Sequence, residues 1–419
     1  MIKPPPTFLG IPVRALRAAF LGVLITATLI PLMGLPYQAD DNVNRSWPML
    51  SIPDAIDAGV TASRTWMFEQ GRFFPGGALY GGVMWNIFDS RVAYMTYLAL
   101  MGMLLVGLVA YVVWRSTKSA QIAAFGALAL GSTMQLRFAG AFDGLASFGG
   151  LVVYTLVLTL VSALLAAHVL HGGSHWFSPL IAVPWGLAIT AYAVSLLMLP
   201  AILLMLVVTA PRVRRWSRWL WAFVPLVVPA ALQIGVTFFL RRRELPLAPA
   251  YQVDLGGPVG TTFGKQFTAA LPMAQEGWGI VPLNATLTIL LIITIGLPLV
   301  LAWRPWFPTL VRVRDRVAVA MAAAGLWAWT VPSVLAAITV RWQAELPWGQ
   351  GYIYLVYEYV GFAFFATGIG TLLFSRREHM WARLSFAALF VVFAAACCAT
   401  AGVNIFGVGT IVPGAQGPG

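Results

Sequence analysis

Charged side chains are scarce in this sequence of 419 residues, since Asp, Glu, Lys and Arg together make up only 10% of it. A typical soluble domain has about 25%. Apolar residues make up 60%, and the mean hydropathy is +0.83. These values exclude a cytoplasmic enzyme, a disordered chain and a small secreted domain. They predict an all-α polytopic membrane protein, because a helix satisfies its own backbone hydrogen bonds in lipid.

Cysteine is nearly absent as well, and the two that occur, Cys397 and Cys398, are adjacent in an apolar run. They supply neither a disulfide framework nor a zinc site. Three histidines at helical spacing, His168, His171 and His175, have no acidic residue near them in the sequence. We therefore expect no metal site and no cofactor, and a divalent cation is not indicated.

Lysine occurs three times, so arginine supplies most of the 26 basic residues and of the net charge of +12. In a soluble protein this charge would favour nucleic-acid binding. In a membrane protein it reflects basic cytoplasmic loops and contact with anionic lipid. We expect membrane lipid as a partner and no nucleic acid.

Apolar runs of about 20 residues, the length that crosses a bilayer, recur along the chain. One further run, 177–210, is too long for a single upright helix, and Pro184 and Pro200 interrupt it. We predict a hairpin of two short helices in this run and about eleven transmembrane helices in total. The other nine predicted spans are 13–34, 91–114, 119–136, 147–171, 216–239, 282–303, 315–338, 352–374 and 379–402.

The basic residues orient this arrangement. With eleven spans and a cytoplasmic N-terminus, sixteen basic residues lie inside and ten outside. A single helix over 177–210 would reverse these numbers, against the positive-inside rule. The prediction is a multi-pass protein of the bacterial cytoplasmic (inner) membrane, with an extracytoplasmic C-terminus.

This topology puts three long loops, 35–90, 240–281 and 339–351, on the outer face, where acidic and aromatic residues gather. Loops with convergent polar groups on a rigid scaffold are common functional sites. We therefore expect one transmembrane domain, 1–402, with its site on the outer loops, followed by a glycine-rich outer tail, 403–419.

The first outer loop carries two adjacent carboxylates, Asp40 and Asp41, soon after the first span. Acids are costly so close to lipid, and a carboxylate can take the proton of a hydroxyl acceptor. Ser51 then marks the N-cap of an amphipathic helix, with an acid in its first turn. We expect this helix to lie along the membrane surface, which by itself needs no catalytic reason.

The second outer loop begins with three arginines, Arg241, Arg242 and Arg243, on the face where the positive-inside rule disfavours them. They are explained either as side chains that reach for the interface from a helix end or as a clamp for a phosphate. Further cations of this face that suit a donor phosphate are Arg45, Arg72 and Lys265.

Aromatic rings, carboxylates and amides occur together in the outer loops, as in carbohydrate sites, because sugars have apolar faces and polar edges. An aromatic belt at the membrane interface explains the same rings. Glu358, one turn inside its span, is the residue that a belt explains least. The candidates for sugar or acceptor binding are Tyr251, Gln266, Gln343, Glu345, Trp348, Tyr352, Glu358 and Asp143.

In its architecture the chain resembles the GT-C superfamily of integral membrane glycosyltransferases that use polyprenyl-phosphate sugars, in their bacterial multi-span form. The resemblance covers essentially the whole chain: one span that starts inside, a long outer loop, then many spans with short inner turns. The segments that carry it are Asp40-Asp41, the amphipathic stretch after them, 263–272 (FGKQFTAALP) and 348–352 (WGQGY).

This resemblance implies a GT-C-like helix arrangement and an enzyme of the cell-envelope glycan. The enzyme would transfer a hexose or pentose from a polyprenyl-phosphate donor to a glycan, lipid or protein acceptor at the outer face. The catalytic acid of these enzymes lies in the first outer loop, which implies Asp40 or Asp41 as the base. Arginine can stabilise the charge of the leaving phosphate.

Three other functions remain open from the sequence. A lipid-linked glycan polymerase or ligase also has many spans and large outer loops, and it would use outer arginines. A transporter or flippase without catalysis predicts charges in mid-span and an internal repeat. A scaffold protein predicts no coherent acidic and basic cluster on one face.

Overall fold

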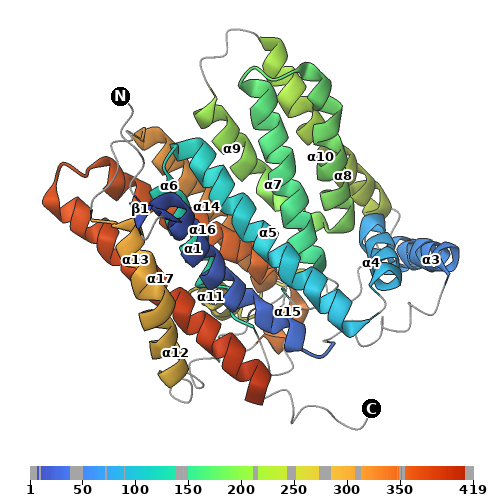
Figure 1. Cartoon of the computed structure of the whole chain (residues 1–419). Coiled ribbons are helices and arrows are strands. Elements are labelled where there is room, and N and C mark those ends of the chain that lie inside the picture. The colour runs from blue at the N-terminus through green and yellow to red at the C-terminus, as the bar shows by residue number, and fades with distance from the viewer. Residues whose placement is uncertain are drawn as a thin grey trace.

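The computed structural model describes residues 7–8, 11–37, 51–70, 73–88, 90–136, 145, 150–210, 216–242, 252–272, 285–306, 313–346, 348, 351 and 354–410. These residues form a bundle of helices, preceded by a two-stranded ribbon of β1 (Thr7–Phe8) and β2 (Ile11–Pro12) (Figure 1). Within the described residues, eight helices are long and apolar enough to cross a membrane. The chain thus has the all-α architecture and the apolar helices of a multi-pass membrane protein.

The eight long helices match the predicted spans to within a few residues, except at the end of the last one. They are α1 (Val13–Leu29) continued by η1 (Ile30–Gly34), α5 (Arg91–Thr117), α7 (Leu151–Leu170), α10 (Trp216–Arg242), α12 (Ala285–Leu291) continued by η8 (Ile292–Gly296) and α13 (Leu297–Trp303), α14 (Asp315–Ala337), α16 (Leu355–Ser375) and α17 (Met380–Thr410). The glycine-rich tail was predicted to begin at residue 403, but α17 continues to Thr410, so the predicted boundary is wrong.

Two helices, α3 and α4, form within residues 35–90, the segment predicted to be the first outer loop. Ser51 is the N-cap of α3 (Ile52–Gln70), as predicted, because its Oγ accepts a hydrogen bond of 3.3 Å from the backbone N–H of Asp54. This helix packs on α4 (Pro75–Ile87), where Ser63 Oγ donates to the Pro75 carbonyl over 3.3 Å. Ile56 of α3 stays exposed, as expected for an amphipathic helix beside lipid.

The run 177–210 folds back on itself, as predicted. After η4 (His175–Phe177), α8 (Ser178–Ala191) crosses the bundle until its last residue meets Gly76 of α4. The chain then turns through η5 (Ala193–Met198), and α9 (Leu199–Thr209) returns, so that Thr209 lines the same cavity as His171 at the end of α7.

We call the side of the bundle with α3, α4, α11 (Val259–Ala269) and α15 (Val340–Glu345) the loop face. The opposite side, where α5 ends and α14 begins, is the basic face, defined by Arg115, Lys118, Arg314 and Arg316. In Figure 1, α11 and α15 lie below the centre of the bundle, and α3 and α4 lie at its right.

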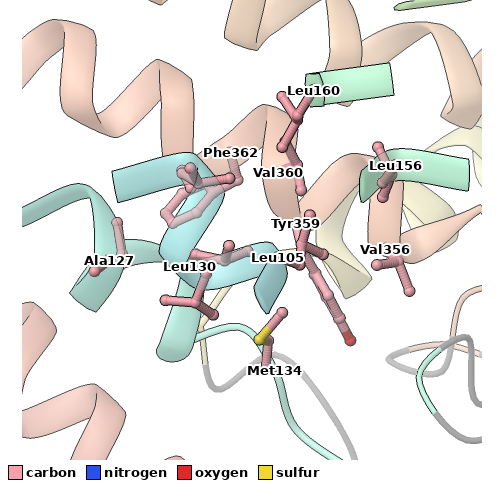
Figure 2. Packing of buried hydrophobic residues seen from close by; sticks show 14 of the residues in the cluster. Leu105, Ala127, Leu130, Met134, Leu156, Leu160, Val356, Tyr359, Val360 and Phe362 are labelled. Carbon is pink, nitrogen blue, oxygen red and sulfur yellow. The ribbon is translucent and has the colours of Figure 1, made fainter. Parts of the chain in front are cut away.

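The core of the bundle lies where α5, α6 (Ala120–Gly131), α7 and α16 meet (Figure 2). There, Leu105, Leu130, Leu156 and Tyr359, one from each of these helices, are buried in a single cluster. The helix α16 is central, since 78% of the residues in its most apolar stretch are buried, compared with 22% in that of α10. The helix α10 therefore lies at the periphery of the bundle.

The closest helix contact in the core joins α14 to α16 through glycine. A Cβ on Gly361 would lie 2.4 Å from the backbone N of Trp329, and one on Gly325 would lie 2.1 Å from the backbone N of Phe365. Helices without a hydrophobic driving force between them associate through such small residues, which let the backbones touch. No other residue type fits these positions without separating the two helices.

Polar side chains complete the hydrogen bonding of backbone inside the bundle. The helix α6 ends at Gly131, and the buried amide of Asn404 in α17 serves the segment after it. Its Nδ2 donates to the carbonyls of Thr28 (2.7 Å) and Met134 (3.1 Å), and its Oδ1 accepts from the N–H of Leu136 (2.8 Å). This side chain supplies the partners that water gives to a helix end at a protein surface.

We predict that Gly361→Ala lowers the thermal stability of the purified protein, because the new methyl group overlaps the backbone of α14. Overpacking of this kind costs about 1–3 kcal/mol or more. Thermal unfolding in detergent, followed by intrinsic fluorescence, measures the effect. The matched control is Gly107→Ala in α5, where a Cβ meets nothing within 4 Å. Equal midpoints for the two variants would contradict the role of Gly361.

Candidate functional site

The short helix α11 inserts at the loop face, against the end of α14. Phe267 stacks on the Trp329 ring, with centroids 4.1 Å apart and planes inclined by 6°. The indole Nε1 of Trp329 also donates to the Phe267 carbonyl over 3.0 Å. The next turn buries Ala269 completely. These contacts fix the position of the whole 263–272 segment on the bundle.

A buried carboxylate lies beneath α11. Glu358, in the first turn of α16, has no exposed surface. Its Oε1 accepts a hydrogen bond of 2.7 Å from Ser333 Oγ of α14, and its Oε2 accepts one of 3.0 Å from Gln266 Nε2 of α11. A buried carboxylate is tolerated only where such donors replace water. We call Glu358, Ser333 and Gln266 the carboxylate cluster.

Two described residues after α15, Trp348 and Gly351, pack against α11. Gly351 has a φ of +60°, and a Cβ there would lie 3.1 Å from Ala269 Cβ and 3.5 Å from Gln266 Nε2. Trp348 lies beside Gly264, where a Cβ would be 3.4 Å from the Trp348 ring. Two segments about 85 residues apart in sequence, both named for the GT-C resemblance, therefore pack on each other. This φ and this close approach explain the glycine at 351.

The side-chain amide of Gln343 connects the segment before α11 to the end of α14. Its Nε2 donates to the carbonyls of Asp254 (2.8 Å) and Ala337 (2.9 Å). Residues 252–254 also exchange backbone hydrogen bonds with 338–340. Among the described contacts, Gln343 joins the loop before α11 to the end of α14, so its amide acts as a structural tie.

The surface of α15 carries a different kind of polar pair. Arg341 Nε lies 2.8 Å from Glu345 Oε2, in an i,i+4 salt bridge with both side chains partly exposed. The Arg341 guanidinium also lies 4.8 Å from the centre of the buried Trp342 ring. Exposed ion pairs of this kind contribute about 0–1 kcal/mol.

Tyr357 joins α16 to α7 and to η5 through side-chain hydrogen bonds, and we call Tyr357, Thr155 and Ser195 the tyrosine lock. The buried Tyr357 hydroxyl forms hydrogen bonds with Thr155 Oγ1 of α7 (2.8 Å) and with Ser195 Oγ of η5 (2.7 Å). The Tyr192 ring packs at 6.3 Å from the Tyr357 ring. The lock holds the tip of the α8–α9 hairpin against α16, next in sequence to Glu358.

A second tyrosine pair lies under α4. The hydroxyls of Tyr80 and Tyr97 are 2.7 Å apart, and Tyr80 stacks on Tyr154 with centroids 4.4 Å apart. Burial, and then the neighbouring Tyr97, raise the pKa of Tyr80 well above its ordinary value. Tyr80 is therefore neutral at physiological pH and anchors α4 to the bundle.

The structure brings together some of the residues predicted for the site. Gln266 and Glu358 bond directly, Gln343 and Glu345 lie on α15, Trp348 is 59% exposed, and Lys265 is half-buried on α11. Nothing is described for the side chains of Arg241 and Arg242 at the end of α10. The predicted residues outside the described part of the chain are Asp40, Asp41, Arg45, Arg72, Asp143, Arg243, Tyr251 and Tyr352.

Ser333 and Trp329 were not predicted from the sequence, although Ser333 belongs to the carboxylate cluster and Trp329 packs on α11 beside it. They lie four residues apart in α14, so they share one side of that helix. A hydroxyl directly after Pro332 inside a span was the only available signal, and it is weak because serine hydroxyls in helices commonly bond the preceding turn. Ser333 Oγ is also 3.2 Å from the Trp329 carbonyl.

Among the described residues, no group of three or more His, Cys, Asp or Glu is placed to hold a metal ion. The described polar groups of the loop face are instead a carboxylate, amides, hydroxyls and aromatic rings. Comparison with protein-family models, with curated proteins and with solved structures finds no match.

We predict that Glu358→Ala destabilises the protein, because it removes the buried carboxylate to which both Ser333 and Gln266 donate. A hydrogen bond to a charged group contributes about 1.5–3 kcal/mol. Thermal unfolding in detergent gives the comparison, with Glu345→Ala as the control that removes an exposed carboxylate. A midpoint for Glu358→Ala at or above that of Glu345→Ala would show that the carboxylate cluster contributes nothing to stability.

Proposed function

We propose that this protein is a membrane glycosyltransferase of the GT-C type. It moves a sugar from a polyprenyl-phosphate donor to an acceptor at the loop face. The observation that supports the proposal best is the carboxylate cluster, because a carboxylate and an amide lie among aromatic rings at one end of an otherwise apolar bundle.

The chemistry of this region suits a sugar. Trp348 exposes its indole above Gly264, and such a ring can stack on the apolar face of a pyranose or furanose. Glu358 itself is fully buried and engaged by Ser333 and Gln266. We therefore assign it a positioning role: it holds α11 in place, and α11 with Trp348 forms one wall of the sugar site.

The catalytic base in this proposal is Asp40 or Asp41. The helix η1 ends at the loop face, where Arg91 Nη1 donates to the Leu35 carbonyl over 2.7 Å. Asp40 follows Leu35 by five residues, which span at most about 18 Å when extended. Either carboxylate can thus act at this face, where it would accept the proton of the acceptor hydroxyl as the new glycosidic bond forms.

The donor phosphate in this proposal meets the arginines at the C-terminal end of α10, of which Arg241 and Arg242 are its last two residues. Gln233 of α10 donates to the Phe73 carbonyl at the start of α4 over 2.7 Å, so the C-terminal end of α10 points to the loop face. Arg241, Arg242 and Arg243 continue the chain from there. Guanidinium groups stabilise the charge that the phosphate oxygen acquires when the bond to the sugar breaks.

The finer topology is part of the same proposal. The eight long helices, together with α6, α8 and α9, would make eleven membrane-crossing segments in a GT-C-like arrangement. The basic face then faces the cytoplasm, by the positive-inside rule, and the loop face lies outside a bacterial cytoplasmic membrane. The acceptor is a glycan, lipid or protein of the cell envelope.

We predict that Asp40→Asn or Asp41→Asn reduces sugar transfer by about 10²- to 10⁴-fold, the usual cost of losing a general base. Purified protein in lipid nanodiscs would receive a panel of polyprenyl-phosphate hexoses and pentoses, radiolabelled in the polyprenyl chain, with a cell-envelope extract as the source of acceptor, and the released polyprenyl phosphate would be measured. The control is Asp54→Asn, an exposed acid of α3. If both variants keep normal turnover, the base lies elsewhere, and if wild type releases nothing from any donor, transport without catalysis is the better explanation.

We predict that Gly260→Cys and Asp57→Cys react with a membrane-impermeant maleimide in intact bacteria. Lys118→Cys should react only after permeabilisation, because it belongs to the basic face. The background for labelling is Cys397→Ala/Cys398→Ala, which removes the two native thiols. Labelling of Lys118→Cys in intact cells would reverse the proposed orientation.

A further inference from the structure

A cavity of about 780 Å³ opens between α5, α7, α9 and α14 in the half of the bundle nearer the basic face. Figure 1 shows α5, α7 and α9 next to one another, and α9 packs on α14. Its volume lies in the range of small-molecule sites. The walls are mostly apolar, with Leu160, Ile202, Leu206 and Phe364 among them.

Four cations gather at the mouth of this cavity. Arg115 and Lys118 come from the end of α5, and Arg314 and Arg316 come from the start of α14. No salt bridge between any of them and an acid is found among the described residues. The neighbouring Asp315 carboxylate accepts instead from Ser375 Oγ of α16 over 2.8 Å. The four cations and this one carboxylate leave the described groups at the mouth with a net positive charge.

A second observation comes from deeper in the cavity. Thr159 lines it and has no exposed surface, yet its Oγ1 has no hydrogen-bond partner among the described residues. Helical threonines usually bond the carbonyl one turn back, as Thr209 bonds Met205 over 2.6 Å in the wall of the same cavity. Because the Thr159 hydroxyl has no exposed surface, it offers no hydrogen bond to a ligand in the cavity, and the apolar walls and the four cations define what the cavity can bind.

We propose that this cavity binds a lipid with a phosphate monoester headgroup, whose chain occupies the apolar space and whose phosphate lies between the four cations. The positive-inside rule explains basic residues along a face, but not four of them around one cavity. A phosphate monoester carries a charge of about −1.5 to −2 and suits such a cluster better than a zwitterionic headgroup. This proposal does not depend on the proposed sugar transfer.

The tyrosine lock bounds the cavity on the side of the loop face. Thr159 lies one helical turn from Thr155, and Met198, also in the cavity wall, lies three residues after Ser195. Both Thr155 and Ser195 bond Tyr357. A lipid chain in the cavity would thus end at the lock and would not reach the carboxylate cluster. The proposed lipid is therefore a resident of the basic-face side and is distinct from a sugar donor at the loop face.

Native mass spectrometry of the full-length protein in detergent tests the site, with dioleoyl phosphatidic acid as the probe. We expect phosphatidic acid to bind more tightly than phosphatidylcholine, and an excess of inorganic phosphate not to displace it. Arg314→Gln/Arg316→Gln should weaken its binding about tenfold or more, because each charge-assisted bond contributes at least that order. Ala163→Phe, which fills the cavity without changing its charge, should weaken it as well.

Matched controls separate the cavity from general surface attraction. Arg376→Gln/Arg377→Gln removes the same charge from residues between α16 and α17 that do not line the cavity, and Ala231→Phe enlarges an exposed alanine of α10. Both controls should bind phosphatidic acid like wild type. The proposal is overturned if phosphatidylcholine binds equally well, if the controls lose as much affinity as the cavity variants, or if Ala163→Phe, eluting as a folded monodisperse species, binds normally.

Discussion

The backbone contact between α14 and α16 is the constraint on which the other polar features depend. Gly325 and Gly361 let the two helices touch, with no side chain between them at these points. Only at this distance can Ser333 Oγ reach Glu358 across the pair, at 2.7 Å. The indole of Trp329 then faces α11 and stacks on Phe267. A bulkier residue in the helix contact would separate the donor from its carboxylate as well as loosen the packing.

The sequence predicted the helices well because lipid leaves so few choices. A run of about 20 apolar residues in a membrane has to be a helix, so span ends follow from hydropathy and flanking charge. The α8–α9 hairpin followed from prolines and from the distribution of arginine. Ser51 as the cap of α3 followed from local hydrogen-bonding rules. Each of these inferences uses neighbours in the chain or a one-dimensional count.

What the sequence could not provide are the pairings between distant segments. Nothing near Asn404 shows that it serves the backbone after α6, some 270 residues earlier. Glu358 stood out as an acid inside a span, but its partners Gln266 and Ser333 depend on how three helices pack. The cavity near the basic face is likewise a property of four helices together, since each of its cations alone looks like an ordinary inner-loop residue.

Buried polar groups give the bundle two distinct ends. Near the loop face, the Glu358 carboxylate and the Tyr357 hydroxyl are each bonded to side chains from two other elements, so that region is closed by internal hydrogen bonds. Toward the basic face, Thr159 is the one unsatisfied buried side chain of the described residues that lines the cavity, and four cations stand at its mouth. In a low-dielectric interior, unpaired groups cost most where no water reaches them. The loop-face end is therefore satisfied by its own hydrogen bonds, whereas the cavity toward the basic face joins a cluster of cations to an apolar interior, which suits a ligand with an anionic head and an apolar chain.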